Sequence, residues 1–449
     1  MRFAPVLFVL CVVPAIVALG TGDDATGWTL APAALVAGGL AVLSFRLPPP
    51  DDATETEDAV AVALAFPLGV LLSFWPYLTH DLRLLDALFE AMSGITATGL
   101  TRYSDIEGQP FGIHFLRAWQ EWVGGYAIVT LTVALLSRGA GGAKKMAQSD
   151  VAEDEGKDGE ESPDLAVRSR WVTLVYAGLT ALCVLIVWAT GQTFGFSVLH
   201  GLTAVSTGGF SAQNDSLGSV PMLAVWVLMG FSVLGAVSLS DYVRPFSGGE
   251  GLRKLAGTLA ALIVLSAIVG GVVLLAEGPE TTAYDAFQVA ASAQTTTGFS
   301  VPTVPEMTDA SKLAMVFSMF VGGDVGSTAG GVKLMRFAAL AVMAYALLSR
   351  RSEATPKKRE QASDALKLVA WWASITLLGW LALVLLGHGA VDALFEWSSA
   401  LNNVGLTSGV SSAVDAPVLT RVLLILAMWF GRVEILAAVL VFRLALRRG

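Results

Sequence analysis

The chain of 449 residues is poor in charge and in the side chains that build most catalytic sites. Only 14% of its residues are charged, where soluble proteins have about 25%. The hydrophobic share is 54%, and 46 glycines come on top of it. This composition excludes a water-soluble enzyme.

Metal-ligating and nucleophilic residues are also scarce. The two cysteines, Cys11 and Cys183, stand alone in apolar stretches, so the chain has neither a disulfide framework nor a C-x-x-C site. Its four histidines lie near expected helix ends and form no H-E-x-x-H motif; they are His80, His114, His200 and His388. The net charge of −9 gives no basic patch for nucleic acid. We therefore expect no bound cofactor, no catalytic metal and no nucleic-acid partner.

What the chain has instead is long apolar blocks. Five stretches contain no Asp, Glu, Lys or Arg, namely 59–79, 171–190, 220–240, 255–276 and 369–387. Five more are nearly as apolar, namely 3–20, 27–45, 114–137, 311–348 and 418–442. Because about 20 apolar residues cross a bilayer as a helix, the pattern predicts an all-α polytopic membrane protein with ten spans. Because Arg2 precedes the first apolar block, that block could also be a signal peptide. The short acidic turn between the first and second blocks instead favours an N-terminal hairpin of two transmembrane helices, residues 1–58.

The basic residues predict the orientation. With the N-terminus inside, 20 of the 28 lysines and arginines fall on the inner side, five on the outer side and three within spans. This asymmetry places both termini in the cytoplasm. The segment 138–170 contains an acidic, glycine-rich stretch, which is typical of a solvated cytoplasmic linker; partner docking is the alternative.

A short motif occurs four times between apolar blocks, each copy ending in Gly, Leu or Phe, and Ser or Thr. The copies end at Thr101, Ser211, Ser300 and Thr407. An aspartate stands thirteen residues before the glycine in three of them (Asp86, Asp285 and Asp392), and Phe196 takes that place in the second. The stretch between suits a re-entrant helix of two to three turns, with the aspartate as its N-cap.

Non-helical backbone at membrane depth is tolerated only where it lines a watery cavity or is buried in protein. Four such loops around one pseudo-fourfold axis would surround a cation with carbonyl oxygens, and glycine with positive φ would turn those carbonyls inward. A single copy would be an ordinary turn, but four copies favour a pore. We therefore predict four helix–pore-loop–helix units, over 59–137, 171–254, 255–368 and 369–449.

On these motifs the chain resembles the Trk/Ktr/HKT superfamily of potassium transport proteins, and its TrkH-type pore subunits in particular. The resemblance implies a filter whose signature glycines are Gly99, Gly209, Gly298 and Gly405. Serine at the first position goes with sodium in that family, so Gly99 implies potassium as the transported ion. The implied potassium-binding residues are Thr96, Ala97, Thr98 and Gly99; Ser206, Thr207, Gly208 and Gly209; Thr295, Thr296, Thr297 and Gly298; and Asn402, Asn403, Val404 and Gly405.

Residues 322–331 contain five glycines and interrupt the span 311–348, which predicts a break in that helix. The stretch resembles the family's intramembrane gating loop; close helix packing is the alternative, which Asp324 and Lys333 disfavour. The implied gate residues are Gly322, Gly323, Asp324, Gly326, Ser327, Thr328, Gly330, Gly331 and Lys333, together with Arg432. A neutral residue is usual in relatives at the position of Asp324.

Three further features complete the resemblance. Arg432 lies mid-span in Gly-Arg-Val-Glu, which resembles a family stretch whose arginine projects into the pore; pairing with Glu434 or Asp324 is a compatible alternative. Trp122 begins a Trp-Val-Gly-Gly stretch that we interpret as packing. Glu90 and Glu396 are interpreted as hydrogen-bonded behind the filter or at the outer surface.

The resemblance implies potassium uptake across the cell membrane by a homodimer, in contact with lipid and regulated by a separate RCK-type nucleotide-binding subunit. A secondary transporter built on broken helices remains an alternative. An intramembrane enzyme is disfavoured by the positions of the histidines.

Overall fold

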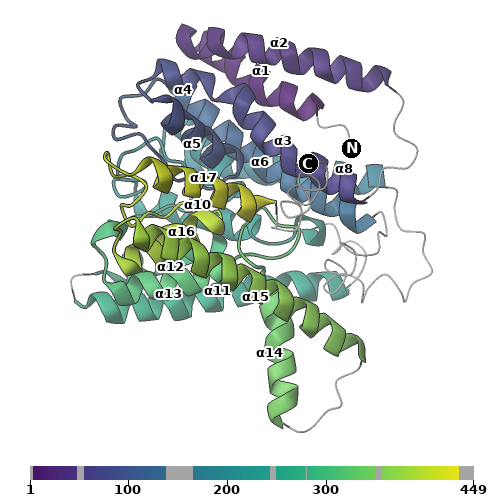
Figure 1. Ribbon diagram of the computed structural model, residues 1–449, viewed down its shortest axis with the longest axis vertical. Helices are drawn as coiled ribbons and strands as arrows, with labels where there is room; N and C mark the ends of the chain where they lie inside the picture. The colour runs from purple at the N-terminus through teal and green to yellow at the C-terminus, as the bar shows by residue number, and fades with distance from the viewer. Residues whose placement is uncertain are drawn as a thin grey trace.

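The computed structural model describes residues 4–47, 55–137, 165–242, 249–279, 281–349 and 356–433 (Figure 1). Within these ranges the regular structure is helical and contains no strand, which confirms the all-α class. Most helices lie roughly parallel in a stack, and α14 (Leu334–Ser349) extends away from it.

The first two helices form a pair. Helices α1 (Ala4–Gly20) and α2 (Asp24–Arg46) pack along each other, and α1 also contacts α3 (Glu55–Ser73) and α6 (Phe111–Ser137). A two-residue turn precedes Asp23, whose side chain caps α2 by accepting the Thr26 N–H.

Four short helices correspond to the four motif copies. They are α5 (Leu84–Ile95), α9 (Phe194–Val205), α12 (Ala283–Thr295) and α16 (Ala390–Leu401). Each has 12 or 13 residues, so at about 1.5 Å per residue it is too short to cross a bilayer. The short helices expected before each filter glycine are present, and we call them the pore helices.

Each pore helix lies between two flanking helices. The outer helices that precede them are α3 with the short α4 (Trp75–Thr79), α8 (Leu165–Ala189), α11 (Gly249–Glu277) and α15 (Pro356–Leu385). The inner helices that follow are α6, α10 (Met222–Gly235), α13 (Asp309–Val321) with α14, and α17 (Val418–Arg432). We refer to these sets, in chain order, as units 1 to 4.

Neighbouring units meet through the same pair of elements. The inner helix of each unit packs on the pore helix of the next: α6 on α9, α10 on α12, α13 on α16, and α17 back on α5. This contact pattern closes on itself. It brings the four pore helices, which lie about 100 residues apart in the chain, around one centre.

Four of the described helices are long and apolar enough to cross a membrane: 24–46, 169–189, 251–277 and 365–385. The predicted interruption of 311–348 is confirmed, since α13 ends at Val321 and α14 begins at Leu334. The uninterrupted span predicted over 220–240 is wrong. Helix α10 ends at Gly235 and a 3₁₀ turn follows at Leu239–Tyr242, because other chain segments bind the last carbonyls of α10.

The predicted N-caps are also wrong. The residues at the N-cap positions of the four pore helices are Arg83, Thr193, Thr282 and Gly389. Asp86, Asp285 and Asp392 lie three residues further on, in the first helical turn. Asp285 takes part in a capping box with Thr282, since the third helical residue can reach back to the N-cap.

The linker predicted over 138–170 lies outside the described residues up to 164, and 165–170 belong to helix α8 rather than to a solvated loop. The end of the predicted last span, 434–442, and Glu434 also lie outside the described residues. Among the described residues, 3₁₀ turns also occur at Leu239–Tyr242 and Val304–Glu306.

Candidate ion pathway

The four loops after the pore helices adopt one conformation. Each glycine has a positive φ, namely 91° at Gly99, 85° at Gly209, 87° at Gly298 and 95° at Gly405. Two residues before each glycine stands a left-handed residue, with φ of 49° at Ala97, 52° at Thr207, 54° at Thr296 and 51° at Asn403. The positive φ predicted for the glycines is present, and a side chain there would be strained.

A backbone hydrogen bond ties each loop to its pore helix. The residue before each glycine donates its N–H to the carbonyl five residues earlier: Thr98 to Ser93 at 2.8 Å, and Gly208 to Thr203, Thr297 to Ser292 and Val404 to Ser399 at 2.9 Å. The repeated bond places each loop at the carboxyl end of its helix. That end carries the negative side of the helix dipole, which favours a cation.

The four glycines lie against one another's loops in a closed cycle. A Cβ on Gly99 would overlap the carbonyl oxygen of Gly208. The same overlap joins Gly209 to Thr297, Gly298 to Val404, and Gly405 to Thr98. Each glycine therefore abuts the carbonyl that precedes the next glycine. The structure brings these four positions into one ring that has no room for side chains.

Carboxylates hold two of the loops from behind. Glu90 accepts hydrogen bonds from the Thr101 hydroxyl at 2.9 Å and the Arg102 N–H at 2.8 Å. Glu396 accepts from the Thr407 hydroxyl at 3.0 Å and the Ser408 N–H at 2.8 Å. Both carboxylates are fully buried, so Glu90 and Glu396 are hydrogen-bonded to the loops that follow their own helices rather than exposed at the outer surface; their position behind a filter stays a prediction.

Sequence reasoning missed three residues that support the other loops. Arg117 pairs with Glu90 at 2.8 Å and donates to the Ser211 carbonyl at 2.9 Å, which joins units 1 and 2. Glu121 accepts the Phe210 N–H at 3.1 Å, and Gln288 accepts the Val301 N–H at 2.9 Å. Only the unusual charge within the predicted span 114–137 signalled Arg117 and Glu121.

The glycine-rich segment 322–331, which we call the gate loop after its predicted role, forms a closed loop between α13 and α14. Its neck is fastened by N–H bonds from Val332 to the Phe320 carbonyl at 3.0 Å and from Leu334 to the Gly323 carbonyl at 2.8 Å. Its predicted gate residues are buried except Gly326, which is half-buried. Asp324 Oδ1 accepts the Val325 N–H at 2.8 Å, and Lys333 Nζ donates to the Ala329 carbonyl.

The gate loop packs against the interrupted end of α10. Asp324 donates its N–H to the Ala236 carbonyl at 2.8 Å, and Thr328 donates its N–H to the Gly235 carbonyl at 3.2 Å. The loop carbonyl of Gly326 in turn accepts the Leu239 N–H at 3.2 Å. These bonds replace the helical ones that α10 would make beyond Gly235.

Arg432 reaches the gate loop from unit 4. Its side chain is 3% exposed, and Nη1 donates to the Thr328 carbonyl at 2.8 Å. Within the part of the chain that the structure describes, Nε and Nη2 have no hydrogen-bond partner. The arginine therefore brings a positive charge, with two unused donors, beside the loop.

These features agree with comparisons to known proteins. The sequence profile of the TrkH family, described as cation transport proteins, matches residues 54–247 and 258–449. The chain belongs to the TrkH family. It is 29% identical over 414 residues to the Trk system potassium uptake protein TrkH of Halomonas elongata, covering 86% of this chain and 85% of that one.

Another relative of this TrkH-family chain is an uncharacterised cation transporter of Methanocaldococcus jannaschii, 28% identical over 398 residues, which cover 85% of this chain and 81% of that protein. The crystal structure of the potassium transporter TrkH from Vibrio parahaemolyticus shares the fold, with a TM-score of 0.79. That match covers 98% of both chains at 23% identity. The family is one of membrane transporters.

Glycines also bring the inner helices of this TrkH-family protein close beneath the pore helices. A Cβ on Gly124, in the Trp-Val-Gly-Gly stretch, would overlap the carbonyl of Ile95, the last residue of its pore helix. Gly431 meets the Leu401 carbonyl in the same way. The interpretation of that stretch as packing is thereby confirmed.

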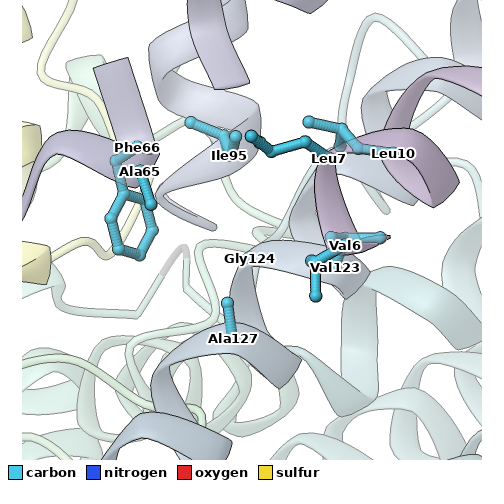
Figure 2. Close-up of a pocket in the computed structure, with 9 residues that line it drawn as sticks. All are labelled: Val6, Leu7, Leu10, Ala65, Phe66, Ile95, Val123, Gly124 and Ala127. Carbon is cyan, nitrogen blue, oxygen red and sulfur yellow. The ribbon is translucent and has the colours of Figure 1, made fainter. Parts of the chain in front are cut away.

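An apolar cavity lies between α1 and the helices α3, α5 and α6 of unit 1 (Figure 2). Its nine lining residues include Leu10, Phe66, Ile95 and Gly124, and none has a polar side chain. Because a dehydrated cation needs oxygen ligands, this cavity does not form part of an ion path through the TrkH-family fold.

Proposed function

We propose that this protein takes up potassium across the cell membrane through one selective pore. The filter consists of the sixteen loop residues named from the sequence, and potassium is the substrate rather than a resident cofactor. The relatives whose names state potassium uptake support this substrate. Family membership supports a transporter rather than an enzyme.

The single observation that carries the proposal is the closed cycle of glycines and carbonyls. Gly99, Gly209, Gly298 and Gly405 each abut the carbonyl before the next glycine. A ring of backbone carbonyls can replace the hydration shell of a monovalent cation without adding charge. The four pore helices aim their carboxyl ends at the same centre, which further favours a cation.

The gate in this proposal is the loop 322–331 together with Arg432. The loop is buried beside the filter and is held there by hydrogen bonds between neutral groups, which can exchange for others at low cost, and by one charged bond from Arg432 to the Thr328 carbonyl. Arg432 opposes cations electrostatically while the loop obstructs the path. Opening requires the loop to move aside and its carbonyls to find other donors.

We further propose the orientation of the protein in the membrane, its oligomeric state and its partner. Both termini lie in the cytoplasm because the basic residues gather on that side. The protein functions as a homodimer surrounded by lipid and binds a cytosolic RCK-type nucleotide-binding subunit, which is TrkA-like. The Trk system named for the relatives supports an association with other Trk components.

Measurement of ion flux into proteoliposomes tests whether potassium is the transported ion. The purified protein, with and without its candidate regulatory subunit, should carry potassium or rubidium much faster than sodium. Planar-bilayer currents should reverse at the potassium Nernst potential. Equal sodium and potassium permeation would contradict the filter assignment.

The second candidate is a cation-coupled secondary transporter. The interruptions in the inner helices of units 2 and 3 favour it, because broken helices form coupling-ion sites in such transporters. The same recordings separate the two functions. A symporter's reversal potential shifts with the sodium or proton gradient, whereas that of a potassium pore does not.

A further inference from the structure

Thr328 is the most fully bonded residue of the gate loop. Its side chain is completely buried, and its hydroxyl donates to the Val205 carbonyl at 3.0 Å and to the Gly235 carbonyl at 2.9 Å, which are alternative acceptors. Its own carbonyl accepts from Arg432, and its N–H donates to Gly235. One residue thus joins the gate loop to two inner helices and to a pore helix.

The position of the Val205 carbonyl explains why its contact with Thr328 matters for ion binding. Val205 is the last residue of pore helix α9, so its oxygen belongs to the negative end of that helix. In the proposed pore, that end faces the cation. The Thr328 hydroxyl therefore binds to a group that would otherwise stabilise an ion.

Two filter hydroxyls also contact the gate loop. Thr296 Oγ1 accepts the Gly330 N–H at 2.7 Å, and Thr207 Oγ1 lies 3.3 Å from Thr328 Oγ1. Thr207 and Thr296 both occupy the left-handed position of their filter loops. In unit 1 the same position is Ala97, so the turn itself does not need a hydroxyl.

We propose that Thr296 and Thr328 latch the gate loop to the filter, so that ion occupancy at the inner end of the filter and loop position are energetically coupled. A cation there competes with the Gly330 N–H for the Thr296 hydroxyl oxygen and with the Thr328 hydroxyl for the Val205 carbonyl. Potassium in the filter therefore weakens the latch and promotes release of the loop. This inference rests on the proposed pore function.

Coupling is reciprocal, so the ion must change the loop as the loop changes ion passage. The test uses Ser327→Cys, because Ser327 is 2% exposed in the gate loop and its hydroxyl differs from a thiol by one atom. Reaction with a hydrophilic methanethiosulfonate is followed in detergent, in potassium chloride and in N-methylglucamine chloride at equal ionic strength. The parent protein gives the background, since Cys11 and Cys183 are buried.

The expected result is a reaction about fivefold or more faster in potassium, which is the lower end of ordinary coupling strengths. Thr296→Ala, which copies Ala97, should bring the rates in the two salts together. Thr296→Ser should keep the difference because it keeps the hydroxyl. The matched control is Ser292→Ala, since the Ser292 hydroxyl, on the pore helix that Thr296 follows, has no hydrogen-bond partner among the described residues.

Equal rates in the two salts, including no measurable reaction in either, overturn the latch. The latch is also overturned if the Thr296→Ala variant keeps the full difference between the reaction rates in the two salts. Potassium-selective flux in the parent protein alongside either result leaves the proposed function intact. Loss of selectivity in the parent contradicts the function itself.

Discussion

At the scale of single residues, both the positive φ and the lack of space require glycine at the four positions of the proposed filter. Gly99 combines a φ of 91° with a neighbouring carbonyl, that of Gly208, where a Cβ would lie. A left-handed non-glycine residue costs roughly 1–2 kcal/mol before any overlap is counted. Relief of the overlap requires the two loops to move apart, which alters the spacing of the ring oxygens.

Gly99→Ser should therefore raise sodium permeation and lower the potassium-to-sodium flux ratio by about tenfold, which corresponds to about 1.4 kcal/mol of lost discrimination. Ion flux into proteoliposomes measures this ratio. The control is Gly178→Ser in α8, where an added Cβ meets no atom within 4 Å. An unchanged potassium-to-sodium flux ratio in the Gly99 variant would contradict the assignment of Gly99 to the filter.

Arg432 supports a second prediction at this scale. Arg432→Ala removes a buried positive charge and the bond to the Thr328 carbonyl. Basal potassium flux should rise about tenfold, as a barrier lowered by about 1.4 kcal/mol gives. The measurement is flux without the regulatory subunit, after size-exclusion chromatography has verified folding. A folded variant that has lost flux would mean that Arg432 acts structurally.

At the scale of elements, the break between α13 and α14 leaves a loop that can change its position without moving the two helices. The gate loop is fastened at its neck, where Val332 bonds to Phe320. Its hydrogen bonds to the loops of the proposed filter involve the Gly330 N–H and the Thr328 hydroxyl. A shorter loop can retain that neck. Deletion of residues 324–329 should raise basal flux several-fold, because it removes the obstruction and leaves α13 and α14 joined.

Tracer uptake without the regulatory subunit measures this effect, and the parent protein at equal reconstitution density is the reference. A deletion variant that folds but stays closed would contradict the assignment of 322–331 as the gate.

The crossing of an inner helix beneath its pore helix leads to another prediction. Gly124→Ala places a methyl group onto the Ile95 carbonyl and should lower the free energy of unfolding by about 1–3 kcal/mol through overpacking. Gly271→Ala in α11 meets open space, so its stability should stay equal or rise. Thermal unfolding in detergent compares the two. Equal melting temperatures would contradict the close approach.

At the scale of the whole molecule, ion pairs join units far apart in the chain. Asp86 of unit 1 accepts hydrogen bonds at 2.8 Å from Arg102 in its own loop and from Arg421 in unit 4. Lys312 of unit 3 pairs with Asp392 of unit 4 at 2.7 Å. In both cases the aspartate thirteen residues before a filter glycine pairs with a cation on the preceding unit's inner helix.

Asp86→Asn should lower the free energy of unfolding by about 3 kcal/mol, because it leaves two largely buried arginines without their anion. The control is Glu306→Gln, a change of the same kind at an exposed side chain. Denaturation in detergent measures both variants. An Asp86 variant as stable as the control would show that this triad does not hold units 1 and 4 together.

Much of the fold and part of the site were predictable from the sequence. Hydropathy, four copies of one motif and five glycines in one span are local patterns, and they correctly indicated the all-α class, the pore helices and the break before Leu334. The mistaken N-caps and the uninterrupted span 220–240 have different causes. The N-caps lie three residues before the expected aspartates, within a local pattern in which Asp285 reaches back to Thr282. The end of α10 instead depends on groups of the distant gate loop that bind its last carbonyls.

The sequence by itself determined that this protein has helices apolar enough to span a membrane and that four glycine turns follow four short helices, because those properties depend on neighbouring residues. Only the tertiary structure decided which glycine meets which carbonyl, that Arg117 bonds to both Glu90 and the Ser211 carbonyl, and that Thr328 binds the end of α9. The partners in these contacts lie about 90 to 300 residues apart in the chain, and no local pattern specifies them.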